Sequence, residues 1–351
     1  MTRTEQTRVP SSLPAGAEVR LGVIGLGRMG AIHAENAASV AGLRLVAVSD
    51  PYAPSLEAAT SRLGVGGHPD WEDLVERADV DAVLICSPSA FHCDQIIAAA
   101  GAGKHVFCEK PIDLDLERID EALHAVERAG VTLQLGFNRR SDRNFVALQG
   151  RIADGVVGEP WLVRLTSRDP APPPEAYVRT SGGLFADMTI HDFDLARFLT
   201  GDEIVEVSAF GAALVNPALE ALPDVDCAIT TLRFATGALG VIENCRQSPV
   251  GYDQRAEIHG PLGTVYAENE QADTVVQADA SGVHRARIAG FLADRYGGAY
   301  REELRSFAES LLTATPPVAS GEDGRTSAIV AAAAQRSYDE RRPVAISEIV
   351  R

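Results

Sequence analysis

The sequence predicts an α/β protein with two domains, an N-terminal doubly wound parallel sheet and a C-terminal α/β domain with an open, largely antiparallel sheet. Short apolar runs alternate with helical patterns in the first half, and strand signals joined by turns dominate the second. The length of 351 residues also exceeds one ordinary core. We expect a flexible tail at 1–18, a first domain at 19–138 and a second at 139–351, whose C-terminal helix could pack back on the first.

The first domain shows a series of strand patterns separated by helices. Apolar runs occur at 19–24, 43–48, 81–86, 105–108 and 131–135, with helical patterns after the first run, from residue 91 and at 116–129. Parallel strands need such crossover helices, and the crossovers are right-handed. In an open parallel sheet, ligands bind beyond the carboxyl ends of the strands, so functional residues are expected there.

The second domain carries paired strand signals instead. The runs 226–234 and 239–245 flank the turn sequence Ala-Thr-Gly-Ala, which indicates a hairpin, and further strands are expected at 255–259, 264–267 and 274–278. Helices, the first of which carries Asp187 and His191, are expected to cover one face of this sheet. The other face must be solvated or covered by a partner, which is consistent with a homo-oligomer.

Charge and composition narrow the possible partners. The 49 acidic residues outnumber the 32 basic ones, which gives a net charge of −17. A nucleic acid or an anionic membrane attracts a basic face, so this balance argues against both. No apolar run reaches the roughly 20 residues that span a bilayer. The opening segment 1–17 also lacks the apolar stretch of a signal peptide.

The cysteines predict neither a disulfide framework nor a metal site. There are five, none in a CxxC pair, and three lie in or beside apolar runs, as buried thiols do. The spacing of Cys86, His92 and Cys93 fits no common zinc site, so no metal is expected. Reduced cysteines are typical of a cytoplasmic protein.

A glycine-rich loop follows the first predicted strand. Gly25, Gly27 and Gly30 have the GxGxxG spacing, with Arg28 and Met29 inside it. The first glycine permits a tight turn, the second lets the backbone approach a pyrophosphate, and the third allows close helix–strand packing. The helix N-terminus then faces the phosphates. The loop predicts a Rossmann dinucleotide site; an ordinary strand–helix turn is the alternative.

An acidic residue ends the next strand and favours one dinucleotide. Asp50 can accept a hydrogen bond from a ribose 2′-hydroxyl, and its charge would repel a 2′-phosphate. No arginine follows it immediately, since the next residues are Pro51, Tyr52 and Ala53. We therefore expect NAD rather than NADP as the cofactor. A surface carboxylate without this role is the alternative.

Polar residues follow three of the predicted strands. Ser87, the pair Glu109-Lys110 and Asn138 each come just after an apolar run, so they are expected at one crevice. His92 begins the helix after Ser87 and is expected to contact the nicotinamide without taking part in the chemistry. A solvated loop lysine, paired with Glu109, is an equal alternative for Lys110.

A carboxylate and an imidazole lie four residues apart in the segment that begins Ser181-Gly-Gly. At that spacing Asp187 and His191 share one helical face. A neutral imidazole there can take a proton while the carboxylate orients it. From spacing alone, a surface hydrogen bond is the alternative. A metal role is disfavoured because no third ligand is evident.

Several segments together resemble the Gfo/Idh/MocA oxidoreductase family over almost the whole chain. They are the glycine loop, Glu109-Lys110-Pro111, Gly-Phe-Asn-Arg-Arg at 136–140, and Gly182-Gly183 through His191-Asp192. Within the family, the segments 167–174, 187–198 and 251–255 are most similar to the inositol 2-dehydrogenases. The resemblance implies NAD-dependent oxidation of a cyclic polyol to a ketone, myo-inositol to 2-keto-myo-inositol, by a homotetramer.

The resemblance also implies roles for particular residues. Lys110, Asp187 and His191 match the catalytic set of the family, and Tyr252 and Tyr300 match tyrosines of its polyol site. Polyol recognition needs many hydrogen bonds, so Asn138 and Arg168 are further substrate candidates, and Glu109 is a candidate for the cofactor. Ser167 and Val250 depart from the pattern of some inositol dehydrogenases. We expect both to face the ring hydroxyls and to determine the stereoisomer.

The sequence is also compatible with other functions. The substrate could be another inositol isomer, a sugar or an anhydrosugar. A silent sugar or dinucleotide sensor is a second possibility, against which the intact Lys110, Asp187 and His191 argue. A glycosidase that uses NAD transiently is a third, and it would release a sugar without net reduction of the cofactor.

Overall fold

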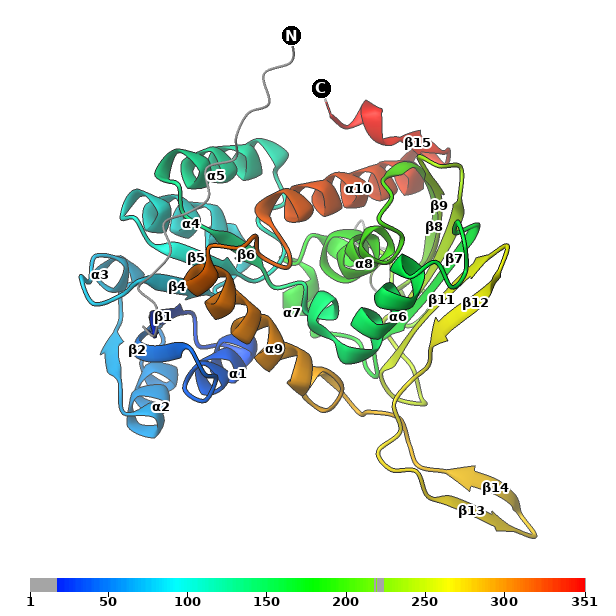
Figure 1. The fold of residues 1–351 in the computed structure, drawn as a ribbon, viewed down its shortest axis with the longest axis horizontal. Helices are drawn as coiled ribbons and strands as arrows, with labels where there is room; N and C mark the ends of the chain where they lie inside the picture. Colours follow the sequence, from blue (N-terminus) through cyan, green and yellow to red (C-terminus); the bar gives the residue numbers. More distant parts are fainter. Residues whose placement is uncertain (1–17, 218, 220–223, 351) are drawn as a thin grey trace. The chain divides into compact units, whose positions relative to one another are not determined.

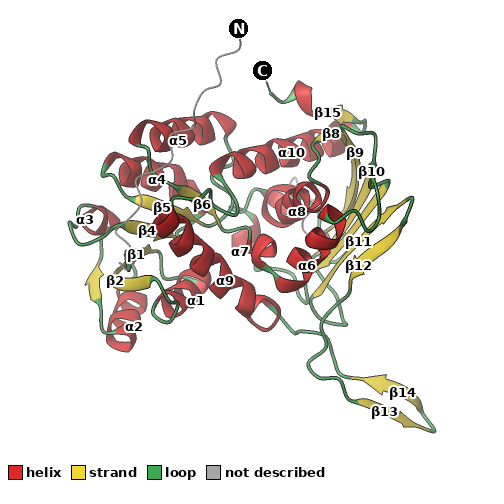
Figure 2. Ribbon diagram, in the orientation of Figure 1, coloured by secondary structure: helices red, strands yellow, loops and turns green. Residues whose placement is uncertain are grey.

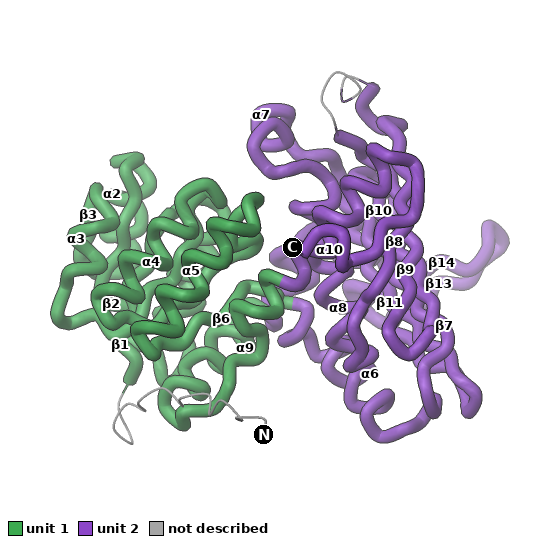
Figure 3. Tube along the Cα trace, turned by 90° about the horizontal axis from the view of Figure 1, so that it is seen from above, with its two compact units in different colours: residues 1–138, 300–325 green, residues 139–299, 326–351 purple. Residues whose placement is uncertain are grey.

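The computed structural model describes residues 18–217, 219 and 224–350, so the expected tail at 1–18 lies outside the described residues except for Glu18. The chain divides into two compact units (Figure 3). The first consists of Met1–Asn138 and Tyr300–Arg325, and the second of Arg139–Ala299 and Thr326–Arg351. The expected boundary at 138 coincides with the first break. Residues 300–325, which the sequence-based division assigned to the second domain, count with the first unit.

The first unit contains a six-stranded parallel sheet in the order β3-β2-β1-β4-β5-β6 (Figures 1 and 2). Its strands are β1 Val19–Ile24, β2 Leu43–Ser49, β3 Gly66–His68, β4 Ala82–Ile85, β5 His105–Cys108 and β6 Leu133–Leu135. The strand order reverses between β1 and β4, and ligands bind at this switch point in sheets of this kind. The predicted doubly wound sheet is confirmed.

Helices complete this unit on both sides of the sheet (Figure 2). They are α1 Arg28–Ala37, α2 Ala53–Leu63, α3 Trp71–Val75, α4 His92–Gly101 and α5 Leu116–Ala129. The C-terminal part of α9, Leu292–Thr313, also packs here: Leu304, Phe307 and Leu311 belong to the apolar core that includes Leu21 and Phe107. Burial of this apolar surface explains why a segment so late in the sequence returns to the first unit.

The second unit contains a seven-stranded sheet in the order β12-β11-β7-β10-β9-β8-β15, parallel only between β7 and β10. Its strands are β7 Leu162–Arg168, β8 Ile204–Ala212, β9 Cys227–Phe234, β10 Leu239–Cys245, β11 Asp253–Gly260, β12 Gly263–Ala267 and β15 Val344–Ala345. The expected open, largely antiparallel sheet is confirmed. The sequence patterns missed β7, β8 and β15. In β7, polar and apolar residues alternate too weakly to indicate a strand.

Helices cover one face of this second sheet (Figure 1). They are α6 Arg143–Ala153, α8 Ile190–Thr200 and the part of α10, Gly321–Glu340, that lies beyond residue 325; the short α7 spans Glu175–Val178. Residues alternate between buried and more exposed along β9 and β10, as expected for a sheet with one covered face. We call the face without helices the outer face.

One expected strand lies outside this sheet. The run 274–278 was expected to belong to it, but β13 Val276–Asp279 pairs only with β14 Gly282–Arg285 as a separate hairpin. All eight residues of these two strands are exposed, and the hairpin extends away from the sheet of the second unit (Figure 1). The run does form a strand, as expected, but this strand pairs with the one that follows it in sequence and not with the sheet. Among the described residues, no helix is long and apolar enough to cross a membrane.

Candidate active site

The glycine loop of the first unit has the backbone that a dinucleotide requires. Gly25 adopts a φ of +86°, which disfavours any side chain, and a Cβ atom at Gly30 would lie 1.8 Å from the carbonyl oxygen of Gly25. A Cβ at Gly27 would meet no atom of the described residues within 4 Å, so among them the loop is open where the motif places a pyrophosphate. Arg28 and Met29 form the first turn of α1. The loop therefore fits the predicted cofactor.

Asp50 fixes this loop from the end of β2. Its Oδ2 accepts the backbone N–H of Leu26 at 2.6 Å, and its Oδ1 accepts that of Tyr52 at 2.8 Å. A carboxylate has about four acceptor sites, so two remain for a ribose hydroxyl. Asp50 thus holds the glycine loop in place and can still accept a hydrogen bond from a ribose hydroxyl, as the sequence predicted.

The residues after β4 are tied to the loop that follows Lys110. The ring nitrogens of His92 lie 2.8 Å from the carbonyl oxygens of Ser87 and Pro111, while the Ser87 hydroxyl donates to Gln95 at 2.6 Å. Burial lowers the pKa of His92, which favours its neutral form. Both ring nitrogens face backbone carbonyl oxygens, and the single N–H of a neutral imidazole donates to one of them, so His92 helps to position the segment between Ser87 and Pro111.

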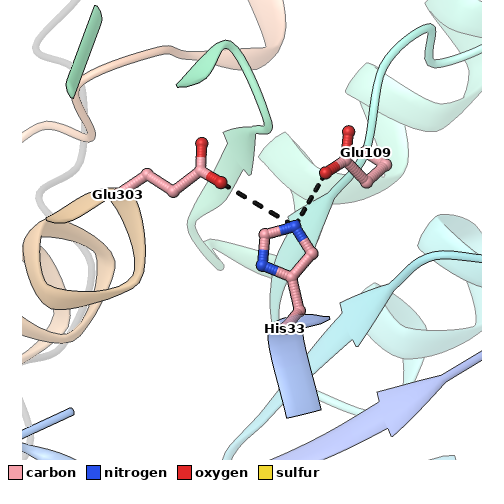
Figure 4. A group of neighbouring side chains, drawn as sticks. All are labelled: His33, Glu109 and Glu303. Carbon is pink, nitrogen blue, oxygen red and sulfur yellow. Dashed lines mark hydrogen bonds and ion pairs between the residues drawn. The ribbon is translucent and has the colours of Figure 1, made fainter. Parts of the chain in front are cut away.

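Glu109 belongs to a buried acidic cluster with His33 and Glu303 (Figure 4). The Nε2 atom of His33 lies 2.8 Å from Glu109 Oε1 and 3.8 Å from Glu303 Oε1. Gly136 leaves the space for this carboxylate, since a Cβ there would lie 2.9 Å from the carboxyl carbon of Glu109. The ring of Tyr300 packs edge-on against His33 at 5.6 Å.

Glu303 lies too far from His33, at 3.8 Å, to share a hydrogen bond with it. Burial, and then the charge of Glu109, raise the pKa of Glu303 well above its usual range, and both carboxylate oxygens of Glu303 lack a hydrogen-bond partner among the described residues. This is also the one group of three or more His, Cys, Asp or Glu residues in the described part of the chain whose potential metal ligands all lie within 4.8 Å of one another. The 2.8 Å contact is shorter than the roughly 3.3 Å between two ligands of a tetrahedral zinc ion. A hydrogen bond therefore explains it.

Asp187 and His191 lie where a π-helical turn, Phe185–Thr189, runs into α8. A π turn is closed by i→i+5 bonds, so residues four or five apart come to the same side, and such turns are frequent at functional sites. Asp187 is buried and His191 is half-buried. The sequence predicted an ordinary helix here, and the wider turn is the correction.

Two residues that the sequence did not single out hold Asp187. The hydroxyl of Tyr177 donates to Oδ1 at 2.7 Å, and Nη1 of Arg246 lies 3.1 Å from Oδ2. The side chain of Arg246 is 2% exposed. Arg246 follows β10 on the side of Asn244, which faces the helices, so strand alternation could have indicated it. Tyr177 lies beyond a proline-rich loop and gave no signal.

A buried polar network lies beneath this pair. Arg139 forms an ion pair with Asp192, and its Nη2 donates to Ser167 and Gln254, each at 2.8 Å. Asn244 donates to the other oxygen of Asp192 at 2.8 Å. The expectation that Ser167 faces the substrate ring is therefore corrected: its hydroxyl donates to Asp192 at 2.7 Å, and the residue is 1% exposed. Val250, in contrast, is exposed.

The expected substrate residues lie in different places. Arg168 pairs with Glu243 and Asp253 on the outer face, opposite to its neighbour Ser167, so it does not lie with Asp187. Tyr252 is buried and packs edge-on against Tyr296 at 5.7 Å.

The predicted site residues are divided between the two units. The first unit contains Lys110, Asn138 and Tyr300, and the second contains Asp187, His191, Arg168 and Tyr252. The peptide bond between Lys110 and Pro111 is cis.

Comparisons with known proteins agree with this architecture. The family model described as an oxidoreductase family with an NAD-binding Rossmann fold matches residues 19–137, and that of the GFO/IDH/MocA C-terminal domain matches residues 145–266. The myo-inositol 2-dehydrogenase of Thermotoga maritima is 45% identical over 95% of this chain and 100% of its own. The inositol 2-dehydrogenase of Rhizobium meliloti is 42% identical over 94% of this chain and 99% of its own.

A solved structure extends the likeness to the fold. The scyllo-inositol dehydrogenase of Lactobacillus casei with bound NAD(H) and scyllo-inositol has a TM-score of 0.89 and 32% identity, covering 94% of this chain and 99% of that one. Both domains of the chain thus match one family in the expected order. The chain belongs to the Gfo/Idh/MocA family of oxidoreductases with an NAD-binding Rossmann fold.

Proposed function

We propose that this protein is an NAD-dependent dehydrogenase that oxidises a secondary hydroxyl of myo-inositol to give 2-keto-myo-inositol. The observation that carries the proposal is the match, at 45% and 42% identity and over nearly the full length, to two relatives named as inositol 2-dehydrogenases. The glycine loop and Asp50 supply the expected cofactor site. Lys110, Asp187 and His191, which match the catalytic set of the family, are all present.

The proposed mechanism divides the removal of two hydrogens between the cofactor and the chain. Bound NAD supplies the hydride acceptor. His191 takes the hydroxyl proton, and Asp187 orients the imidazole and stabilises its cation. The cationic Lys110 stabilises negative charge that develops on the same oxygen. Tyr177 and Arg246 hold the Asp187 carboxylate in one orientation, so that it presents a fixed acceptor to the base.

The substrate residues are proposed with one change from the sequence-based expectation. Tyr252, Tyr300 and Asn138 stay as candidates for hydrogen bonds to ring hydroxyls. Arg168 is left out, because its guanidinium is paired on the outer face of the sheet. Glu109 is retained as a residue of the cofactor side, where its carboxylate is positioned by His33.

A substrate panel tests the activity. NADH absorbance is measured with myo-, scyllo- and chiro-inositol and with common hexoses, using NAD and NADP in parallel. Reduction of NAD with myo-inositol is expected, and no reduction with any inositol would overturn the proposal. Sugar release without net NADH formation would identify a glycosidase instead.

Replacement of the proposed base tests the mechanism. His191→Ala should lower kcat by about 100-fold or more, since general base catalysis contributes at least that much, while the Kd for NAD stays unchanged. Lys110→Met should lower kcat similarly. If both residues act on one oxygen, the double variant should lose less than the product of the single losses. Unchanged turnover in His191→Ala removes this residue from the role.

A second substrate is favoured by one observation. The Lactobacillus casei relative whose structure holds scyllo-inositol matches this chain over 94% of its length. The alternative is therefore oxidation of scyllo-inositol to the same ketone. The ratio of kcat/KM for the two isomers decides between them.

We also propose that the protein is a homo-oligomer, four copies by family resemblance, that packs through the outer face. Phe210 and Ile229 lie directly opposite each other on β8 and β9, and they are 70% and 51% exposed. Leu162 and Leu239 form a second exposed apolar pair on β7 and β10, while Ile229 itself pairs with Glu243. Exposed apolar patches of this kind mark interaction sites. Light scattering should show an oligomer that Phe210→Glu with Ile229→Glu dissociates; an oligomer that persists contradicts this interface.

We further propose that the protein works in the cytoplasm. All five of its cysteines are free thiols, which is typical of a reducing compartment. Fractionation of the cells that express it, followed by immunoblotting, tests this location. Recovery outside the cytoplasm would contradict it.

A further inference from the structure

The buried contact between His33 and Glu109 links the helix of the glycine loop to the segment that carries Lys110. His33 lies in α1, which begins at that loop, and Glu109 directly precedes Lys110 after β5. The two side chains point toward each other, with 2.8 Å between His33 Nε2 and Glu109 Oε1 (Figure 4). A carboxylate can only accept a hydrogen bond, so the imidazole is the donor.

Packing fixes the orientation of the His33 ring. Its side chain is 0% exposed, and the rings of Phe107 and Tyr300 lie against it, each at a centroid distance of 5.6 Å. Its other nitrogen, Nδ1, is buried and has no hydrogen-bond partner among the described residues. A buried polar atom without a partner costs stability that an apolar side chain would not cost. Costs of this kind are typical of functional sites.

The segment around Lys110 is held on both sides of the lysine. Before it, the backbone N–H of Glu109 donates to the carbonyl of Ile85 at 2.9 Å, in addition to the side-chain bond from His33. After it, a ring nitrogen of His92 lies 2.8 Å from the carbonyl oxygen of Pro111. The backbone is therefore constrained immediately before and immediately after Lys110.

We propose that His33 is a positioning residue for Lys110 and acts by holding the Glu109 carboxylate. This inference rests on the role proposed above for Lys110 in the reaction. The hydrogen bond limits how far the lysine segment can move relative to α1, whose N-terminus is expected to face the pyrophosphate. A displacement of about 1 Å can cost about 100-fold in rate, so a single buried bond at this point affects turnover.

Two amides that differ by one methylene group test this hydrogen bond. In His33→Asn the amide ends near the position of Nδ1, so the bond is lost, whereas the longer His33→Gln can still donate from near the position of Nε2. His33→Asn should lower kcat by about tenfold or more, while the Kd for NAD changes less than about twofold. His33→Gln should keep most of the wild-type kcat. Equal losses in the two variants, or a folded His33→Gln with a tenfold loss, overturn the proposal.

The Lys110→Met background separates positioning of the lysine from a general loss of stability. If His33 acts through the lysine, adding His33→Asn to Lys110→Met should leave kcat within about twofold of the single variant. Losses that multiply contradict the proposal. His105→Asn is the matched control, because His105 is buried at the opposite end of β5 and its Nδ1 accepts the backbone N–H of Thr132 at 3.0 Å. It should leave kcat unchanged.

Chemical labelling examines Lys110 without measuring turnover. The chain has two lysines, Lys104 and Lys110, which lie beyond opposite ends of β5 and are both half-buried. The Nζ atom of Lys104 donates to the carbonyls of Arg77 and Val80, each at 2.8 Å, so this lysine is the internal reference. The native full-length protein is treated with a trace of acetic anhydride. Digestion with chymotrypsin, which can cut after Phe107, then separates the two lysines for mass spectrometry.

The labelling ratio of Lys110 to Lys104 decides whether His33 holds the segment. It should rise by about threefold or more in His33→Asn, because a segment that opens locally exposes its amine. It should stay at the wild-type value in His33→Gln and in His105→Asn. An unchanged ratio in His33→Asn overturns the proposal. If the wild type oxidises no inositol, the proposed function fails, and the ratio still tests the contact of His33 with the lysine segment.

Discussion

The two units carry parts of the candidate site that are built in different ways. In the first unit, the cofactor loop depends on backbone shape within one short segment, Gly25 to Gly30, closed by Asp50. In the second, Asp187 is held by Tyr177 and by Arg246, which is 59 residues away in sequence. A site formed by the backbone of one short segment can be predicted from a sequence motif. A site formed by side chains from distant segments can be predicted only in part.

The largest expected effect comes from the buried network of the second unit. Arg139→Met leaves Asp192 charged and nearly inaccessible, and breaking one partner of a buried ion pair costs about 3–5 kcal/mol. The matched control is Arg143→Ala, whose ion pair with Glu270 involves an arginine side chain that is 80% exposed. It should cost at most about 1 kcal/mol. Urea unfolding of both variants measures the difference, and equal losses would refute this account of the network.

The glycine loop allows a test that separates folding from cofactor binding. Gly30→Ala places a methyl group against the Gly25 carbonyl, so the fold should lose about 1–3 kcal/mol. The methyl group of Gly27→Ala meets no described residue within 4 Å, so this variant should leave the melting temperature unchanged. It should still weaken NAD binding by about tenfold, because that methyl group occupies the path of the pyrophosphate. Calorimetry with NAD measures both, and full NAD affinity in Gly27→Ala would argue against this position of the phosphates.

These contrasts explain what the sequence could and could not predict. The loop, Asp50 and the Asp187–His191 pair were visible because each depends on short spacings. Arg168 and Ser167 were both expected at the substrate, yet Arg168 lies on the outer face and Ser167 binds Asp192. The strand that carries them, β7, had not been recognised, so its alternation could not be used. Arg246, Tyr177 and the partners of His33 depend on contacts between distant segments, which no spacing reveals.

A smaller effect is expected when Asp187 loses its buried cation. Arg246→Met should lower kcat by about tenfold, equivalent to 1.4 kcal/mol, because the carboxylate loses the buried guanidinium that contacts its Oδ2. NAD affinity should not change. Arg168→Met, on the opposite face of the same sheet, is the matched control and should change kcat less than twofold. If Arg168→Met causes the larger loss, the sequence-based assignment of Arg168 to the substrate site is restored.

A pH-dependent effect is expected from Glu303. Burial and the charge of Glu109 raise its pKa in the folded protein, and His33 and Cys86 are the other titratable groups that face it. Its stabilising contribution is therefore present below its ordinary pKa and is lost as pH rises through the folded value. Glu303→Gln cannot ionise, so it should gain on the wild type by at most about 1.4 kcal/mol per pH unit above pH 4.5.

The neighbouring Glu302 is the control for this test, because its stability contribution is expected to change with pH in the opposite direction. Its side chain is 45% exposed and pairs with Arg305, and that hydrogen bond lowers the pKa of Glu302. Glu302→Gln should therefore lose stability relative to the wild type above about pH 4.5, and the difference should vanish in acid. Urea midpoints from pH 4 to 8.5 compare the two variants. A Glu303→Gln difference that does not grow with pH would show that this carboxyl carries its charge as readily in the fold as in water.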